Sequence, residues 1–348
     1  MRFLGTLALT HSSRRTNLAR CSAPFLVRRF GDPGRLQRLP PFESLPPPEP
    51  LYSGAASFFR VLQEGRALRL QPLGAIKHRD KIQHVAFLDE DRLLVGYEQR
   101  VELWRRRTVE RTYEHPHLAG LHTVAPIPGS RALLACSSPD AVLVLDLESG
   151  EVERTLRMPV NLYSRGYDLV PGMDLRRHYI GDEGQTTHLN AAHPAGGGRA
   201  VVSTLIQGAV GAFDLQTGEY EEIARGFVGC HGARVNEEGE VYFADGPAGH
   251  LVFLDGQGRV ARRFDAGSRW LHDVQQIAGG VYAFALADKN ELAVWDIDRG
   301  ELLCRQRFFT WPVEGLFGLA RRLPFWLGNS TQALSFSPAP PPARDRAG

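Results

Sequence analysis

Five histidines stand at the start of strand-like segments that recur along the chain. About two dozen residues after four of them comes the same turn, in which an aspartate is followed closely by a glycine. The histidines are therefore in register with a repeat. Neutral imidazole is a common ligand for transition metals and also serves as a base or a nucleophile. The five candidates are His84, His122, His188, His231 and His272.

Each histidine is followed by four short strand-like segments. In the clearest unit, residues 121–158, these segments are apolar or alternating runs separated by Gly, Pro, Ser or Asp. Four strands in a period of roughly 40 residues are typical of a propeller blade. We therefore predict an all-β fold, a six-bladed β-propeller of four-stranded antiparallel blades.

The sixth blade is predicted to be split between the two ends of the chain. Segments at 317–321, 325–328 and 333–336 would supply inner strands, and residues 66–70 the outer strand. Pairing of N- and C-terminal strands would close the ring and remove exposed strand edges. Phe317 takes the histidine position in this unit, so the ring is predicted to contain five histidines and one phenylalanine.

The innermost strands of a propeller surround a central channel, so equivalent residues of successive blades converge on its axis. Three or four converging imidazoles with an open position define a catalytic metal site. We therefore predict that the five histidines bind a divalent transition metal, Fe, Zn or Cu, at the channel mouth. Asp273 follows His272 and is predicted to join the metal or to support one of its ligands.

Three other interpretations stay open. Clustered histidines without metal act as general acids, bases or nucleophiles, or bind an anion when protonated. They can instead be structural, with bonds only to neighbouring blades and to ordered water in the channel. A scaffold that binds a protein or a small ligand on its top face needs no histidine chemistry.

The connection before His188 is about 25 residues longer than the others, and loops of this length inside compact domains are commonly functional. Each connection between blades leads directly into the innermost strand of the next blade, where the histidine lies. This insertion, residues 160–187, is therefore predicted to cover the histidines as a lid. Its Arg165 and His178 are candidate catalytic residues. The alternative is a decoration that makes no contact with a ligand.

Three short segments of the repeat resemble sequence motifs of known propeller families. The segment from Cys230 to Ala233, followed by residues 236–244, is similar to the units of six-bladed NHL, SMP-30 and streptogramin-lyase propellers. The segment from His188 to Asn190, and the segment from His272 to Gln275, resemble the H-x-N and H-D-x-Q phrases of bacterial arylsulfotransferases.

The arylsulfotransferase resemblance implies a metal-free reaction. In that family, channel histidines bind the sulfuryl group and one becomes its covalent carrier, helped by an asparagine and an arginine. His188 and Asn190 match by position, whereas residues 201–207 contain no arginine. Arg165, Arg176 or Arg177 of the insertion would have to replace it. Metal-free group transfer or a lyase reaction is thus the alternative to a metal-dependent oxidoreductase, oxygenase or lyase.

The composition argues against nucleic acid and membrane as partners, so a small-molecule substrate is expected. It leaves the oligomeric state open. The formal net charge of +2 is small for 348 residues and gives no basic stripe for nucleic acid. No apolar run approaches the ~18 residues of a membrane-spanning helix, so no membrane is expected as a partner. The four cysteines show no CxxC spacing, which fits a reducing compartment.

Both ends of the chain are predicted to be disordered. Residues 1–50 are interpreted as an Arg- and Pro-rich leader and linker, residues 51–337 as the propeller, and residues 338–348 as a tail. The first 31 residues contain no Asp or Glu, as in mitochondrial transit peptides. We expect a cytoplasmic protein, or an organellar or exported one if this leader is a targeting segment rather than unstructured chain or a misassigned start.

Overall fold

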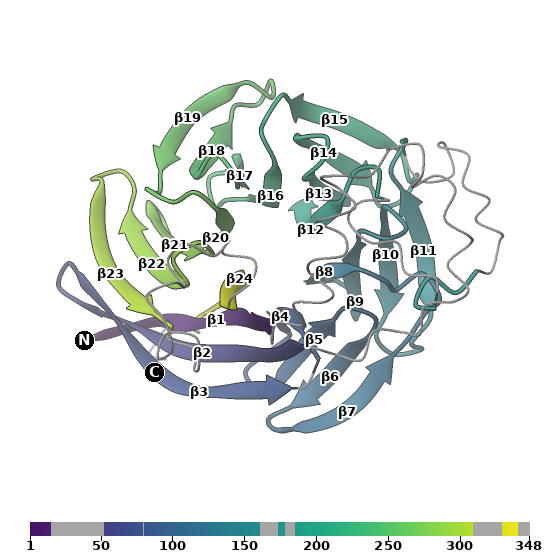
Figure 1. Ribbon diagram of the computed structural model, residues 1–348, viewed down its shortest axis with the longest axis horizontal. Coiled ribbons are helices and arrows are strands. Elements are labelled where there is room, and N and C mark those ends of the chain that lie inside the picture. Colours follow the sequence, from purple (N-terminus) through teal and green to yellow (C-terminus); the bar gives the residue numbers. More distant parts are fainter. Residues whose placement is uncertain (15–51, 79, 161–172, 178–184, 309–328, 340–348) are drawn as a thin grey trace, which may run out of the picture.

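The computed structural model describes residues 1–14, 52–78, 80–160, 173–177, 185–308 and 329–339. They form six four-stranded antiparallel sheets arranged as the blades of a ring around a central channel (Figure 1). This confirms the predicted six-bladed β-propeller. The described residues contain no helix that is long and apolar enough to cross a membrane.

Three blades follow one another from the first histidine of the repeat. The first contains β4 (Ile82–Phe87), β5 (Arg92–Tyr97), β6 (Val101–Arg105) and β7 (Thr108–Tyr113). The second contains β8 (Leu121–Ile127), β9 (Arg131–Cys136), β10 (Ala141–Asp146) and β11 (Val152–Arg157). The third contains β12 (Leu189–Gly196), β13 (Arg199–Thr204), β14 (Ala209–Asp214) and β15 (Tyr220–Arg225).

Two more blades continue the same meander. The fourth contains β16 (Cys230–Val235), β17 (Val241–Asp245), β18 (His250–Leu254) and β19 (Val260–Asp265). The fifth contains β20 (Leu271–Ala278), β21 (Val281–Leu286), β22 (Glu291–Asp296) and β23 (Glu301–Arg307). In all five, the first strand is innermost and the fourth is outermost (Figure 1).

The sixth blade joins the two ends of the chain and closes the ring, as predicted, but the strands are divided between the ends differently from the prediction. Its order is β24-β1-β2-β3, with one C-terminal and three N-terminal strands. The prediction placed its outer strand correctly, but the segments predicted at 317–321 and 325–328 lie outside the described residues. The four strands are β24 (Asn329–Pro338), β1 (Arg2–Arg14), β2 (Tyr52–Glu64) and β3 (Ala67–His78).

Strand β1 corrects the expectation that residues 1–50 are disordered throughout. It pairs with β2 on one side and with β24 on the other, so both of its edges are used. Leu7 and Leu9 pack in the core against the fifth blade, and Ala8 packs against the first. A strand that is buried on both faces explains the apolar run near the N-terminus, which composition alone assigned to a leader.

The recurring aspartate closes the turn between the third and fourth strands of a blade. In the second blade, Oδ1 of Asp146 accepts hydrogen bonds from the backbone N–H groups of Glu148 at 2.8 Å and Ser149 at 2.6 Å. Asp214 holds the third blade's turn in the same way. Gly150 adopts φ of +85°, a conformation that a side chain would strain. The repeated motif is therefore a turn and not a functional site.

Two substitutions on β1 test whether it is an integral strand. Leu9→Ala should lower the free energy of unfolding by about 2–5 kcal/mol, because the leucine is fully buried and its loss leaves a cavity. Phe3→Ala is the matched control on the same strand, because Phe3 is 40% exposed and should matter much less. Urea unfolding followed by circular dichroism measures both. Equal and negligible effects would show that β1 is dispensable.

Candidate functional site

The strand pairing shows which residues occupy the same level of the channel. Each innermost strand has a register irregularity near its start, for example between the pairs Leu121↔Cys136 and Thr123↔Ala135. The residue that follows the first of these pairs is skipped by the pairing in the first, second, third and fifth blades, whereas in the fourth blade the irregularity lies one residue later, after the pair His231↔Ala244. The six residues at this level all border one cavity. These six residues are Gln83, His122, Asn190, His231, His272 and Gln332.

This ring corrects the prediction that five histidines share one strand position. His84 lies one residue beyond the ring position, and His188 lies two residues before it. A shift of one residue turns the side chain of His84 to the other face of its strand, whereas His188 lies in the connection just before β12, so alignment on the histidine letter alone placed both wrongly. Phe317, which was expected in the sixth blade, lies outside the described residues. In that blade the pairing of β24 places Gln332 in the ring.

Four of the five histidines nevertheless lie together at the start of the innermost strands, and we call them the mouth cluster. The ring centroids of His122 and His188 are 4.8 Å apart, and those of His231 and His272 are also 4.8 Å apart. His188 bridges the two pairs, at 6.5 Å from His231. The cluster therefore comes from four consecutive blades on one side of the channel.

Asp140 positions His188 in this cluster. Asp140 is fully buried in the turn between β9 and β10, and its Oδ2 accepts a hydrogen bond from the N–H of Thr186 at 3.0 Å. Its Oδ1 accepts one from the N–H of Thr187 at 3.2 Å. Burial raises the pKa of Asp140, while these hydrogen bonds favour its ionised form. The carboxylate thereby holds the chain just before His188, which adopts a positive φ of 51°.

Three imidazoles of the mouth cluster, His122, His231 and His272, have lowered pKa values that keep them neutral near pH 7. Burial lowers the pKa of His122 well below its usual range, and His188 and Lys81 lower it further. Burial, then His272 and His188, do the same to His231. For His272, burial outweighs the opposing effect of Asp273 and lowers the pKa to about 4. The strongest charge effects on His122 and His231 therefore come from other imidazoles and from Lys81.

The predicted metal site is not reproduced as a ligand set. Within the described ranges, no group of three or more His, Cys, Asp or Glu side chains is arranged to hold a metal ion. His84 is separated from the mouth cluster and lies beside His193, with ring centroids 6.1 Å apart. Binding of Fe, Zn or Cu by these histidines stays a prediction.

Asp273 makes a buried ion pair with Arg234 across two blades. Nη2 of Arg234 lies 3.0 Å from Oδ2 of Asp273, and Nη1 contacts Oδ1. The same carboxylate accepts the N–H of Leu334 at 2.8 Å, while Nη2 donates to the Leu334 carbonyl at 3.1 Å. Nη1 also donates to the carbonyls of Gly232 and Val274. With these partners, Asp273 is a structural group and not a free base.

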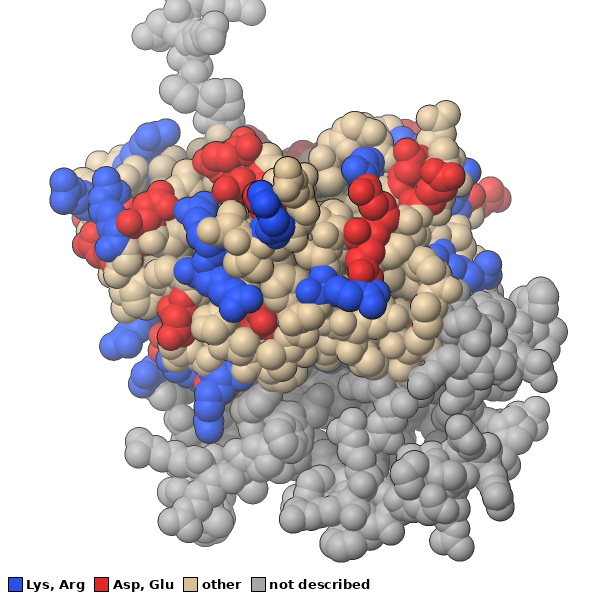
Figure 2. All heavy atoms as spheres, turned by 90° about the horizontal axis from the view of Figure 1, so that it is seen from above, with Lys and Arg blue, Asp and Glu red and all other residues tan. Residues whose placement is uncertain are grey.

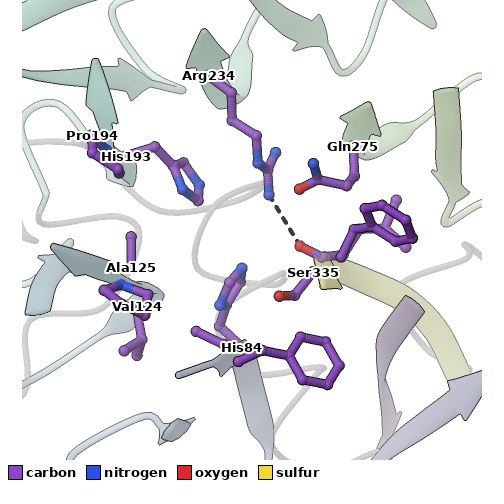
Figure 3. Close-up of a pocket in the computed structure, with 13 residues that line it drawn as sticks. His84, Val124, Ala125, His193, Pro194, Arg234, Gln275 and Ser335 are labelled. Atoms are coloured by element: carbon purple, nitrogen blue, oxygen red, sulfur yellow. Dashed lines mark hydrogen bonds between the residues drawn. The ribbon is translucent and has the colours of Figure 1, made fainter. Parts of the chain in front are cut away.

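The ion pair divides the channel into two spaces. On the side of the mouth cluster is a cavity of about 20 Å³, bordered by the six ring residues and by Asp273. On the other side lies a larger cavity of about 180 Å³, bordered by Arg234, His84 and His193 (Figure 3). Sequence analysis missed Arg234, although an arginine within the predicted inner strand, between Ala233 and Val235, was the available signal.

The side-chain amide of Asn190 also makes its hydrogen bonds to other groups of the protein. Its Nδ2 donates to the carbonyl of Cys230 at 2.8 Å, and its Oδ1 accepts the hydroxyl of Ser203 at 2.7 Å. Both contacts are buried, and the first joins neighbouring blades. The asparagine of the H-x-N phrase is therefore in the ring, but its amide holds the third blade against the fourth.

Only part of the predicted insertion is described. Arg165 and His178 lie outside the described residues. Arg176 is bound by Asp174 at 2.9 Å and by Glu114 at 2.8 Å, and Leu175 packs in a buried position. The N–H of Leu175 donates to the carbonyl of Pro116 at 2.9 Å. Residues 173–177 are thus held against the connection that precedes β8.

Comparison with known proteins gives the fold but no family. No family model matches the chain, and no curated protein matches its sequence. A chain from a crystal structure of a nidogen/laminin complex superposes with a TM-score of 0.57 at 10% identity, covering 95% of this chain and 98% of that one. A protein of unknown function from Bacteroides caccae gives 0.54 at 14% identity, covering 80% and 94%. At such identities the likeness concerns architecture alone.

Loss of the central ion pair should be costly. Arg234→Ala leaves a buried carboxylate without its partner, and we expect the free energy of unfolding to fall by about 3–5 kcal/mol. Arg92→Ala is the matched control, because it removes a largely exposed ion pair with Asp89 and should have little effect. Urea unfolding compares the two. An Arg234→Ala protein as stable as the wild type would contradict the structural role of the pair.

Acidification should destabilise the protein. Among the described residues, six histidines have pKa values lowered to about 4 or well below the usual range, chiefly by burial, and are neutral near pH 7: His11, His84, His122, His193, His231 and His272. Since their pKa values are lower in the folded than in the unfolded protein, stability is full above about pH 6.5 and falls as the pH approaches 4. Between pH 7 and pH 5, each of these histidines should lower the free energy of unfolding by up to about 2 kcal/mol.

Urea unfolding at successive pH values measures this loss. The His11→Leu protein should lose less over the same interval, because His11 lies on β1, away from the mouth cluster, and its pKa is lowered to about 4 by burial. A stability that is constant or rises from pH 7 to pH 5 would refute the assignment of buried neutral imidazoles.

Proposed function

We propose that the mouth cluster binds the anionic group of a small organic molecule and that one of its neutral imidazoles acts on that molecule as a base or a nucleophile. The observation that carries this proposal is the contact of four imidazoles from four blades beside Lys81. Such a site attracts negative charge, and an anion in it would stabilise protonated imidazolium.

The carboxylates near the cluster are already engaged. Asp273 is paired with Arg234, and Asp140 accepts hydrogen bonds from Thr186 and Thr187. Only the charge of Asp273 is neutralised by a cation, and Lys81 adds positive charge at the mouth, which supports an anion as the ligand. The space below the ring, about 20 Å³, has room for about one water-sized atom, so one oxygen of the anionic group would enter it.

Buried nitrogens give the ligand specific contacts. Nε2 of His231 and Nδ1 of His272 are both buried without a hydrogen-bond partner in the described part of the chain. Buried polar atoms in folded proteins are normally satisfied by protein, water or ligand. Neutral imidazole is also the form that acts as a nucleophile or a general base, and here the lowered pKa values keep it available near pH 7.

A divalent metal is the second candidate, because the same two unpartnered nitrogens belong to uncharged imidazoles, the form that coordinates metals. Elemental analysis of protein purified without a histidine tag separates the two proposals. One equivalent of metal that is lost in His231→Gln supports the metal. Metal near zero, with anion binding intact, supports the metal-free site.

Isothermal titration with inorganic phosphate and with benzenesulfonate tests the anion proposal. Binding should take up protons, so affinity should rise by up to about tenfold per pH unit and per proton taken up as the pH falls from 7.5 to 5.5. His231→Gln and His272→Gln should each weaken binding by about tenfold or more. His250→Gln, on the third strand of its blade, is the control and should bind as the wild type does.

The titration has two adverse outcomes. Affinity that does not change with pH would contradict a site of clustered imidazoles. No binding of either anion, at a pH where circular dichroism shows a folded protein, would leave the propeller as a scaffold for a protein or for a neutral ligand and would overturn the proposal.

A further inference from the structure

The larger cavity lies beyond the ion pair, further along the same innermost strands. Its volume is about 180 Å³, and it shares no lining residue with the space below the mouth cluster. Figure 3 shows His84 and His193 pointing into it from different blades, with Arg234 above them. We call this space the inner chamber. Any ligand bound there is separated from the mouth by the Arg234–Asp273 pair.

The imidazoles of the inner chamber have unused hydrogen-bonding capacity. Both ring nitrogens of His84 and Nε2 of His193 are buried without a partner among the described residues, and His84 is only 2% exposed. The carbonyls of Leu334 and Val124 lie near enough to His84 to favour its protonated form, but they do not complete hydrogen bonds of normal geometry. Three buried ring nitrogens without partners at one space are costly unless something binds there.

Charge in the chamber is balanced, which favours an uncharged occupant. Arg234 is neutralised by Asp273, and its Nη atoms also bond to backbone carbonyls. Burial, with a further contribution from Arg234, lowers the pKa of His193 well below its usual range and that of His84 to about 4, so both rings are neutral. An ion entering the chamber would lose its hydration without gaining an unpaired opposite charge.

The rest of the wall is mainly apolar. Phe87, Phe336 and Val124 line the chamber, and Pro194, an exposed residue, lies at its rim. Gln275 and Ser335 add two polar side chains (Figure 3). A cavity of this volume can hold a molecule of about the size of benzene. An apolar wall with a few convergent polar groups is the usual composition of a small-molecule site.

We propose that the inner chamber is a second binding site, for a small uncharged molecule with an aromatic or branched apolar part and one hydroxyl or amide. The polar group would lie between His84 and His193, whose ring centroids are 6.1 Å apart, and bond to both. The apolar part would pack against Phe87 and Phe336. The site does not depend on anion binding at the mouth.

Three matched probes test the proposal with the full chain: benzyl alcohol, toluene and benzoate. Ligand-observed NMR and isothermal titration should show benzyl alcohol binding at least about tenfold more tightly than toluene, because toluene leaves the imidazoles unpaired. Benzoate should also bind at least about tenfold more weakly, because its charge must be desolvated.

Substitutions locate the site. His84→Leu and His193→Leu should each reduce the preference for benzyl alcohol over toluene by about fivefold or more, since the partner of the hydroxyl is lost while the apolar wall stays. His231→Gln, in the mouth cluster, should leave benzyl alcohol binding unchanged. If His84→Leu fails to fold, which circular dichroism reveals, His193→Leu decides alone, because His193 lies next to the exposed rim.

Each contrary result has a definite meaning. Equal binding of toluene and benzyl alcohol would show an apolar cavity in which the histidines take no part. Tighter binding of benzoate would show an anion site, and loss of binding in His231→Gln alone would place the ligand at the mouth. Failure of all three probes to bind at about 10 mM, where even weak ligands are detected, would refute the inner chamber as a site.

Discussion

The buried ion pair between Arg234 and Asp273 is the interaction on which the interior of the ring depends. It ties the innermost strands of the fourth and fifth blades to each other and to Leu334 of the sixth. Because both charges are almost completely buried, they are stable only as a pair with further hydrogen bonds. The same pair separates the mouth cluster from the inner chamber. One ion pair therefore both joins the blades and separates the two candidate binding sites.

The two spaces differ in the charge they can accept, although both contain histidine. At the mouth, Lys81 disfavours protonation of His122, and added negative charge would offset this effect. In the inner chamber the charge of the Arg234 guanidinium is already neutralised by Asp273, so a bound anion would gain no unpaired positive charge there. On the face shown in Figure 2, basic and acidic side chains intermix over the described residues, and neither sign gathers in one patch.

Sequence reasoning recovered what local patterns determine. Alternating runs, turn glycines and the repeated aspartate predict the four-stranded blades, because each of these features depends on neighbouring residues. It failed for features that depend on strand pairing between residues far apart in the sequence. The partners of β1 are distant in sequence, and the levels of His84 and His188 depend on the pairing register. Arg234 was passed over because nothing nearby in the sequence shows that Asp273 neutralises it.

Closure of the ring through β1 also determines when the protein can fold. The hydroxyl of Thr10 accepts a hydrogen bond from the N–H of Ala333, 323 residues further along the chain. During synthesis β1 is made before its partner β24, so one edge of the sixth blade stays open until the strands of the other five blades have been made. Non-local pairing of this kind is slow, and exposed edges invite association with other chains. The ring of the nascent protein therefore cannot close before β24 is available to pair with β1.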